Sequence, residues 1–192
     1  MPERNQAALD FLLSRRSVPA KVMTGPVPSR DELEVILTAA ARTPDHGMLE
    51  PWRFIVLEGA AFQRVMDEIR LAGERQGRPE EQIEKPMPHY RNAELAVVVV
   101  EATDPTASVP VVEQVYSAGA VCLSLLNAAL ASGWGANWLS GWFSQDAQFR
   151  KDALGLADHE RIAGIVHIGT PKFEPSDRPR PDLSTKTTWV SA

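Results

Sequence analysis

Apolar positions along the chain follow a helical repeat in several stretches. After the capping box Ser29–Glu32, apolar residues at 33, 36, 37 and 40 are spaced i, i+3, i+4 and i+7, which predicts a buried helical stripe. This helix should end near Thr43, because Pro44 disfavours helical geometry in the residue before it. Further helices are predicted over 5–14, 60–76, 111–132 and, with Ser144 as the cap and Gly155 as the stop, 144–154.

Strands are predicted where β-branched residues are dense. Residues 95–100 form the continuous apolar run Leu-Ala-Val-Val-Val-Val, which is typical of a strand buried on both faces. Shorter strands are predicted over 53–58, 136–139 and 162–169. No repeat or long linker divides the chain, and 192 residues suffice for one core, so we expect a single α+β domain over 1–192.

Three segments leave alternatives open. Residues 77–92 are polar and contain three prolines, which predicts a mobile excursion with one helical turn, acting as a lid, a partner contact or a plain surface loop. The helix over 111–132 is apolar on nearly all sides, which is typical of a core helix or of a subunit seam. The β-prone segment Thr187–Val190 follows a proline-rich tail and has no obvious local strand partner, so it could pair with a second subunit's sheet.

Charge and composition exclude some classes of protein. The formal net charge is −5, whereas a general nucleic-acid binder normally carries a basic excess. A lone cysteine, Cys122, excludes an internal disulfide framework and fits a reducing compartment. The N-terminus is polar, and the longest small-apolar tract, 118–131, is shorter than the roughly 20 residues that span a bilayer. We therefore expect a soluble cytoplasmic protein that binds neither nucleic acid nor membranes.

Several kinds of catalytic site find no support in the sequence. The four histidines (46, 89, 159 and 167) and Cys122 show no metal-ligand spacing, so no metal site is predicted. The Gly-x-Ser-x-Gly elbow of serine hydrolases does not occur. A Gly-x-Gly at 133–135 follows a helix and lacks the third glycine of a dinucleotide fingerprint. His167 falls in a strand pattern and is interpreted as a satisfied core or interface residue.

Two polar stretches are candidates for binding. The stretch 42–54 reads Arg-Thr-Pro-Asp-His and then Pro-Trp-Arg-Phe, and it joins a predicted helix to a predicted strand, where binding loops usually lie. In it, Asp45 is interpreted as a turn-forming residue rather than a base. The second stretch, Arg15-Arg16-Ser17, closes the first helix. Its arginines either cap the helix dipole or form a phosphate clamp, in which guanidinium forks and a hydroxyl bind phosphate oxygens.

Four features occur in one order over most of the chain: Arg-Arg-Ser at 15–17, the 42–54 stretch, Trp-Leu-Ser-Gly at 138–141 and Gly-Thr-Pro at 169–171. As an ordered set they make the chain resemble the FMN-dependent nitroreductase family, most closely its minimal, YdjA-type NAD(P)H nitroreductases. The resemblance implies a nitroreductase-like α+β fold in which helices flank a central mixed, mainly antiparallel sheet. It also implies a homodimer with the C-terminal segment exchanged or packed on the partner.

The resemblance further implies which residues bind the cofactors. FMN contacts are implied for Arg15, Arg16, Ser17, Arg42, His46, Trp138, Leu139 and Ser140, with the Arg42 match reaching over from the partner subunit. Arg178 or Arg180 could help to bind the phosphate. Trp52 and Trp138 can also be interpreted as plain core aromatics. Nicotinamide-cofactor binding is implied for a segment that also reads as an ordinary helix end, namely Ala128, Ala129, Leu130, Ala131, Ser132 and Gly133.

The implied reaction is ping-pong: NAD(P)H reduces FMN and leaves, and a flat electron acceptor such as a nitroaromatic or a quinone takes its place. Because the flavin carries the redox chemistry, no catalytic side chain is assigned. Two alternatives stay open: a same-fold enzyme that dehalogenates reductively or consumes its flavin, and a flavin-binding protein without turnover. Leu139 and Glu50 stand where the YdjA-type pattern has arginine and glutamine, and Leu139 can offer only backbone contacts to a flavin.

Overall fold

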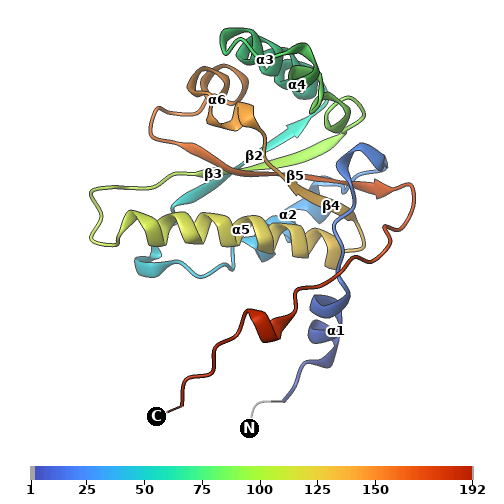
Figure 1. The fold of residues 1–192 in the computed structure, drawn as a ribbon, viewed down its shortest axis with the longest axis vertical. Helices are drawn as coiled ribbons and strands as arrows, with labels where there is room; N and C mark the ends of the chain where they lie inside the picture. Colours follow the sequence, from blue (N-terminus) through green and yellow to red (C-terminus); the bar gives the residue numbers. More distant parts are fainter. Residues whose placement is uncertain (1–2, 192) are drawn as a thin grey trace.

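The computed structural model describes residues 3–191, which form a five-stranded sheet with helices on both faces (Figure 1). The strands are β1 (Met23–Thr24), β2 (Trp52–Glu58), β3 (Leu95–Glu101), β4 (Gly135–Leu139) and β5 (Arg161–Pro171). Their order is β2-β3-β5-β4, with the short β1 paired to the end of β5. The expected α+β fold is confirmed. Every strand pairing among residues 3–191 is antiparallel. The sheet of one chain is therefore antiparallel and not mixed as expected.

Two helical layers enclose this sheet. Helices α2 (Arg30–Ala40) and α5 (Val111–Ala131) cover one face, and α3 (Ala61–Arg75), α4 (Glu80–Glu84) and α6 (Ala147–Leu154) cover the other (Figure 1). The first helix, α1 (Gln6–Ser14), stands away from both layers, and its residues are not buried. Short 3-10 turns complete the fold: η1 (Ala20–Val22), η2 (His46–Met48), η3 (Met87–His89), η4 (Trp142–Gln145) and η5 (Leu183–Thr185).

The continuous apolar run of β3 serves both layers, as predicted for a strand buried on both faces. Alternate side chains of a strand point to opposite faces of its sheet. Val98 and its alternate neighbours pack toward α3 and α6, whereas Val97 and Val99 pack toward α2 and α5. All residues from Leu95 to Val100 are buried. β3 therefore contributes side chains to both hydrophobic cores, as does β5.

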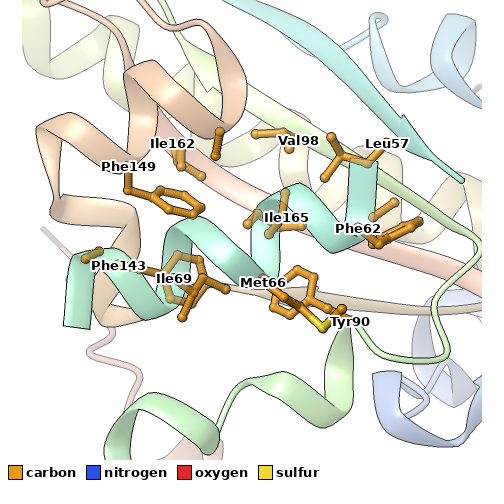
Figure 2. Close-up of a cluster of buried hydrophobic side chains, with 14 of the residues drawn as sticks. Leu57, Phe62, Met66, Ile69, Tyr90, Val98, Phe143, Phe149, Ile162 and Ile165 are labelled. Carbon is orange, nitrogen blue, oxygen red and sulfur yellow. The ribbon is translucent and has the colours of Figure 1, made fainter. Parts of the chain in front are cut away.

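The segment 77–92 is docked onto the protein rather than forming a mobile excursion. It contains α4 and η3, and it buries Met87 and Tyr90 almost completely. Figure 2 shows the Tyr90 ring among the side chains that α3 directs toward the sheet. On the other side, Gly73 of α3 meets Ile83 so closely that an added Cβ would lie 2.5 Å from it. The plain-surface-loop interpretation is therefore wrong for this segment.

Helix boundaries follow local capping chemistry. The predicted capping box at Ser29 and Glu32 is present, with both reciprocal hydrogen bonds. Gly155 ends α6 in the left-handed conformation, as expected. The prediction that Ser144 caps α6 is wrong: Asp146 accepts the hydrogen bond from the Phe149 backbone N–H, and Ser144 is buried in η4. Asp146 is the better cap because it stands immediately before the first helical residue.

Helix α5 has one buried face and one exposed apolar face. By length and composition it could cross a membrane, but a core helix passes the same test. Val121, Leu125 and Ala129 are fully buried against the sheet and α2. On the outer face, Tyr116 is 70% exposed and Leu123 is 45% exposed. The core-helix reading is therefore confirmed for the inner face, and the subunit-seam reading of the exposed outer face stays a prediction.

The C-terminal tail leaves β5 and runs past α1 along the outside of the molecule (Figure 1). Its apolar side chains are exposed, including Leu183 (70%), Trp189 (91%) and Val190 (92%). The β-prone segment 187–190 forms no strand in this chain. Its expected pairing with a second subunit stays a prediction.

Candidate functional site

The Arg15–Ser17 segment lies against the outer edge of β4. It follows α1, and the next residue, Val18, donates its backbone N–H to the Ala136 carbonyl at 3.0 Å. The Asn137 side-chain amide donates back to the Val18 carbonyl at 2.8 Å. These two hydrogen bonds fix Arg15–Ser17 beside β4, which includes Trp138 and Leu139 and is followed directly by Ser140. Two of the three predicted groups of flavin-contacting residues are thus adjacent in one chain.

The side chain at Leu139 explains one departure from the YdjA-type pattern. It packs against Val18, Ala20 and Met23 in a small apolar cluster beneath the Arg15–Ser17 segment. An arginine at this position would bring a charge into that cluster. Leu139 therefore stabilises the segment by apolar contact and leaves its backbone groups for a ligand.

The arginine side chains of this segment form their hydrogen bonds away from the end of α1. Arg15 donates from Nη2 to Ser17 Oγ at 3.0 Å, and its buried Nε has no hydrogen-bond partner in the described chain. Arg16 donates from Nε to the Ser176 carbonyl of the tail at 3.2 Å. The pKa of Arg15 is lowered, first by burial and then by the positive charges of Arg180 and Arg16. The arrangement favours the phosphate-clamp interpretation, because it places three guanidinium groups and an unused donor together.

A cavity of about 250 Å³ opens next to Leu139 and Ser140. The β4–η4 connection forms one wall and the 77–92 segment forms the other, with Lys85, His89 and Tyr90 among the lining residues. His89 Nδ1 is buried without a hydrogen-bond partner in residues 3–191. Burial, and then the charge of Lys21, lowers the pKa of His89, so this imidazole is neutral near pH 7. Sequence reasoning missed Lys85 and His89, whose only signal was their place in a polar, proline-containing segment.

The loop after α2 presents Arg42 and His46 elsewhere. His46 Nδ1 lies 2.6 Å from the Glu113 carboxylate in the first turn of α5. His46 and Glu113 line an open hollow of about 570 Å³ on the outer side of α5. Arg42 is exposed in the turn just after α2 and lies beside Thr38 and Val35 of that helix.

Hydrogen bonds to α5 hold this loop in place. Ser117 Oγ accepts from Trp52 Nε1 at 3.1 Å and donates to the Pro44 carbonyl at 2.9 Å. Met48 and Glu50 have φ values of 53° and 47°, a left-handed conformation that non-glycine residues adopt at a cost. Such strain is maintained where surrounding contacts fix the loop.

Two predictions about single residues of this loop can be compared with its contacts. The Asp45 carboxylate accepts the Glu50 backbone N–H, so Asp45 shapes the turn as interpreted. Trp52 packs in the core on the α2–α5 side, as a core aromatic would. Trp138 differs, because it is 38% exposed over Gly164 of β5.

His46 is held at the N-terminal end of α5, whereas β4 begins just beyond the C-terminal end of that helix. Glu113, which holds His46, is in the first turn, and Ala131 ends the helix shortly before β4 begins at Gly135. At 1.5 Å per residue, Glu113 and Ala131 lie about 27 Å apart along the helix. One chain therefore brings together Arg15–Ser17 and Trp138–Ser140, but it does not bring His46 to them.

The segment implied for nicotinamide binding forms an ordinary helix end. Ser132 donates from Oγ to the Ala128 carbonyl at 2.8 Å, and the Gly133 and Trp134 backbone N–H groups bond back to Leu130 and Ala129. These bonds satisfy the last carbonyls of α5. Helix termination thus accounts for the residues, and their role toward a nicotinamide cofactor stays a prediction.

His167 is buried as predicted, but it is not satisfied. Neither ring nitrogen has a hydrogen-bond partner in the described chain, and the ring packs against Tyr90 (centroids 5.0 Å apart) and Phe62. Burial, followed by the charge of His89, lowers the pKa of His167 to about 3. It is therefore a neutral core residue at physiological pH.

Comparison with known proteins identifies the class. The model of the nitroreductase family matches residues 12–170, so this chain belongs to the nitroreductase family. A protein of Escherichia coli K12 named "Putative NAD(P)H nitroreductase YdjA" is 32% identical over 169 residues, which cover 88% of this chain and 91% of that protein. A "Putative NAD(P)H nitroreductase" of Haemophilus influenzae is 36% identical over 164 residues, covering 85% of this chain and 88% of that one.

Solved structures confirm the fold. A nitroreductase-like family protein from Bacillus cereus superposes with a TM-score of 0.82 at 23% identity and covers both chains completely. A Desulfovibrio desulfuricans protein, called "a putative nitroreductase in complex with fmn", has a TM-score of 0.73 at 24% identity, and the match covers 96% of each chain. The expected nitroreductase-like fold and the expected family are thus both confirmed.

Proposed function

We propose that this chain is an FMN-dependent oxidoreductase that transfers electrons from NAD(P)H to nitroaromatic, quinone or similar flat acceptors by a ping-pong mechanism. The observation that carries the proposal is the arginine-rich segment 15–17 fixed along β4, beside the cavity at Leu139 and Ser140. Names of relatives agree with it: the E. coli and H. influenzae proteins carry NAD(P)H nitroreductase names, and the D. desulfuricans protein is described with FMN.

The residues of the site fit a phosphorylated flavin. Arg15 has a buried guanidinium nitrogen without a partner, and Ser17 and Arg16 lie beside it, so the segment can donate several charge-assisted hydrogen bonds to one phosphate. The cavity beyond is lined by apolar and aromatic side chains with few polar groups, of which Lys85 and His89 are two. This is the usual composition of a cofactor site.

Each part of the site would have its own task. Arg15, Arg16 and Ser17 would hold the phosphate, and backbone groups at Leu139 and Ser140 would bind the ring system. Lys85 and His89 would offer donors to its polar edge. When bound, FMN supplies the redox chemistry by taking a hydride equivalent from NAD(P)H and passing electrons on. The protein's own contribution is to bind, orient and shield, and no side chain has to act as a nucleophile.

A second copy of the chain would complete the site. His46 pairs with Glu113, Arg42 lies beside Thr38 and Val35, and no hydrogen bond or ion pair among residues 3–191 joins either to Arg15–Ser17, so we infer that they serve such a segment on a partner. The outer face of α5 is apolar and exposed, which suits a subunit contact. The outer edge of β2 has no strand partner among residues 3–191, and the tail carries exposed Trp189 and Val190. We infer a homodimer with the tail packed on the partner subunit.

We also infer a cytoplasmic location. The chain's cysteine, Cys122, is a free and fully buried thiol, and burial raises its pKa to about 12. Such a thiol is a core residue and suits a reducing compartment.

An absorption spectrum tests the proposed function. Freshly purified protein, after addition of FMN if needed, should show the bands of bound oxidised flavin, and anaerobic NADH or NADPH should bleach them. A nitroaromatic or a quinone should then restore the bands. Colourless protein that ignores added FMN would refute the proposal. Bound flavin that neither nicotinamide cofactor bleaches would instead indicate a flavin-binding protein without turnover.

Product analysis separates the remaining alternative. A halogenated phenol that loses halide anaerobically, or flavin that disappears in the presence of oxygen, would indicate the same fold with different chemistry. Reduction of the nitro group with intact flavin is the result expected for the proposed function.

A further inference from the structure

A carboxylate of the tail sits among the arginines of the candidate phosphate site. Asp177 Oδ1 lies 2.9 Å from Arg180 Nη2 and 4.0 Å from Arg16 Nε. The preceding residue, Ser176, accepts the Arg16 Nε hydrogen bond through its carbonyl at 3.2 Å. Arg180 is also close enough to Arg15 to contribute to the lowering of its pKa, after burial. Asp177 is therefore the negative group within a cluster of three arginines.

The charges of this cluster do not cancel. The guanidinium groups of Arg16 and Arg180 pair with the Asp177 carboxylate, Arg15 adds a third positive charge beside them, and the side chain of Asp177 is 72% exposed. Exposed pairs of this kind are screened by water and contribute about 0.2–1 kcal/mol each. The pKa of Asp177 is lowered, first by the Arg178 backbone N–H and further by Arg180 and Arg16, so the carboxylate is ionised at neutral pH. A phosphate ester, with about two negative charges at pH 7, would neutralise the cluster better than this carboxylate does.

We propose that Asp177 is an internal counter-ion that competes with the phosphate of FMN for Arg16 and Arg180, and so limits how strongly the site prefers FMN over unphosphorylated riboflavin. This inference rests on the proposed function, because it takes the arginine cluster as the phosphate site. Binding of the phosphate displaces the carboxylate from the two guanidinium groups, and the weakness of the exposed contacts makes this displacement easy. The residue sets specificity through the arginines without touching the flavin ring.

Flavin affinities of three variants test the inference. Dissociation constants for FMN and for riboflavin are measured by quenching of flavin fluorescence for the wild type, Asp177→Asn and Asp177→Glu. Asp177→Asn should bind FMN about two- to fivefold more tightly, which is the fold-change that corresponds to losing one or two exposed pairs. Its riboflavin affinity should not change, and Asp177→Glu, which keeps the charge, should stay near the wild type.

Asp182→Asn is the matched control. Asp182 is in the same tail and loses the same charge, but its side chain accepts the Ser184 backbone N–H instead of pairing with an arginine. It should leave both affinities unchanged. In addition, the gain of Asp177→Asn should shrink as salt is raised, because counter-ions screen exposed charges.

Each contrary result has a definite meaning. Unchanged or weaker FMN binding by Asp177→Asn, or an equal change for FMN and riboflavin, would overturn the role of Asp177 while leaving the proposed function intact. An equal gain in Asp182→Asn would overturn it as well, since the effect would then come from net charge. Failure of every form, wild type included, to bind FMN would overturn the proposed function and the inference together.

Discussion

Removing both guanidinium groups of the Arg15–Ser17 segment is the most direct perturbation of the candidate site. In Arg15→Ala/Arg16→Ala the polypeptide path should persist, because backbone and amide hydrogen bonds at Val18, Ala136 and Asn137 hold it against β4. The arginine side chains themselves contribute only contacts to Ser17 and to the Ser176–Asp177 part of the tail. The variant should therefore fold and lose affinity for FMN.

The size of the loss follows from the donors removed. A hydrogen bond to a charged group contributes about 1.5–3 kcal/mol, and one such bond per arginine amounts to about 3–6 kcal/mol for the pair. Every 1.4 kcal/mol is a factor of ten, so the dissociation constant for FMN should rise by at least about a hundredfold. Arg15→Lys/Arg16→Lys should fall between the wild type and the alanine variant, because lysine keeps the charge but lacks the guanidinium fork.

Equilibrium titration of flavin fluorescence measures these affinities, with circular dichroism to verify folding. Arg30→Ala is a suitable control, because Arg30 lies on the exposed side of α2 and pairs only with Glu34 four residues away. Riboflavin affinity should change far less than FMN affinity in the alanine variant. Wild-type FMN affinity in a folded Arg15→Ala/Arg16→Ala protein would refute the phosphate assignment.

Three further predictions concern stability. Arg53→Ala removes the two hydrogen bonds, of 2.6 and 2.7 Å, that join Arg53 to the Glu160 carboxylate. The free energy of unfolding, measured with urea, should fall by about 1–3 kcal/mol, and partial exposure of Arg53 (43%) keeps this loss small. The pair, chiefly its Arg53 hydrogen bond, lowers the pKa of Glu160, so its contribution should be complete above the ordinary pKa of 4.5 and decrease as pH falls through the lower folded value. An unfolding free-energy difference between wild type and Arg53→Ala that does not decrease from neutral to acid pH would contradict this. Gly73→Ala should push Ile83 away and lower the melting temperature, whereas an unchanged melting temperature would mean that the contact relaxes freely. Met87→Ala leaves a cavity at a fully buried position, so the free energy of unfolding should fall by about 2–5 kcal/mol and the 77–92 segment should become sensitive to protease. Equal protease resistance would show that other contacts hold the segment.

Local chemistry predicted much of the fold. The capping box at Ser29, the left-handed stop at Gly155 and the β-branched run at 95–100 each depend on residues close in sequence, and each was found where expected. One error was local, since Asp146 and not Ser144 caps α6, but the error over 77–92 arose where long-range packing decides. Met87 and Tyr90 are isolated apolar residues in a polar, proline-containing segment. Because they belong to no helical or strand repeat of apolar positions, the sequence did not predict that they pack in the core against α3.

The candidate site divides in the same way. Motifs in the sequence pointed to Arg15–Ser17 and to Trp138–Ser140, but their adjacency results from hydrogen bonds between segments more than a hundred residues apart. Lys85 and His89 could not be selected from sequence, because they enter the cavity only through the docking of the 77–92 segment. The separation of His46 from Arg15 likewise depends on the direction and length of α5, which no local motif encodes.

The length of α5 would have a consequence for the geometry of a dimer. In a two-fold pair of such chains, each α5 would extend from one composite site to the other, so its span would set the spacing between the two sites. Inserting one helical turn would add about 5.4 Å and move the loop at His46 away from its target on the other chain, even though every residue of both sites were kept. Substitutions on the exposed face of this helix, as at Leu123, should be tolerated far better than insertions or deletions there.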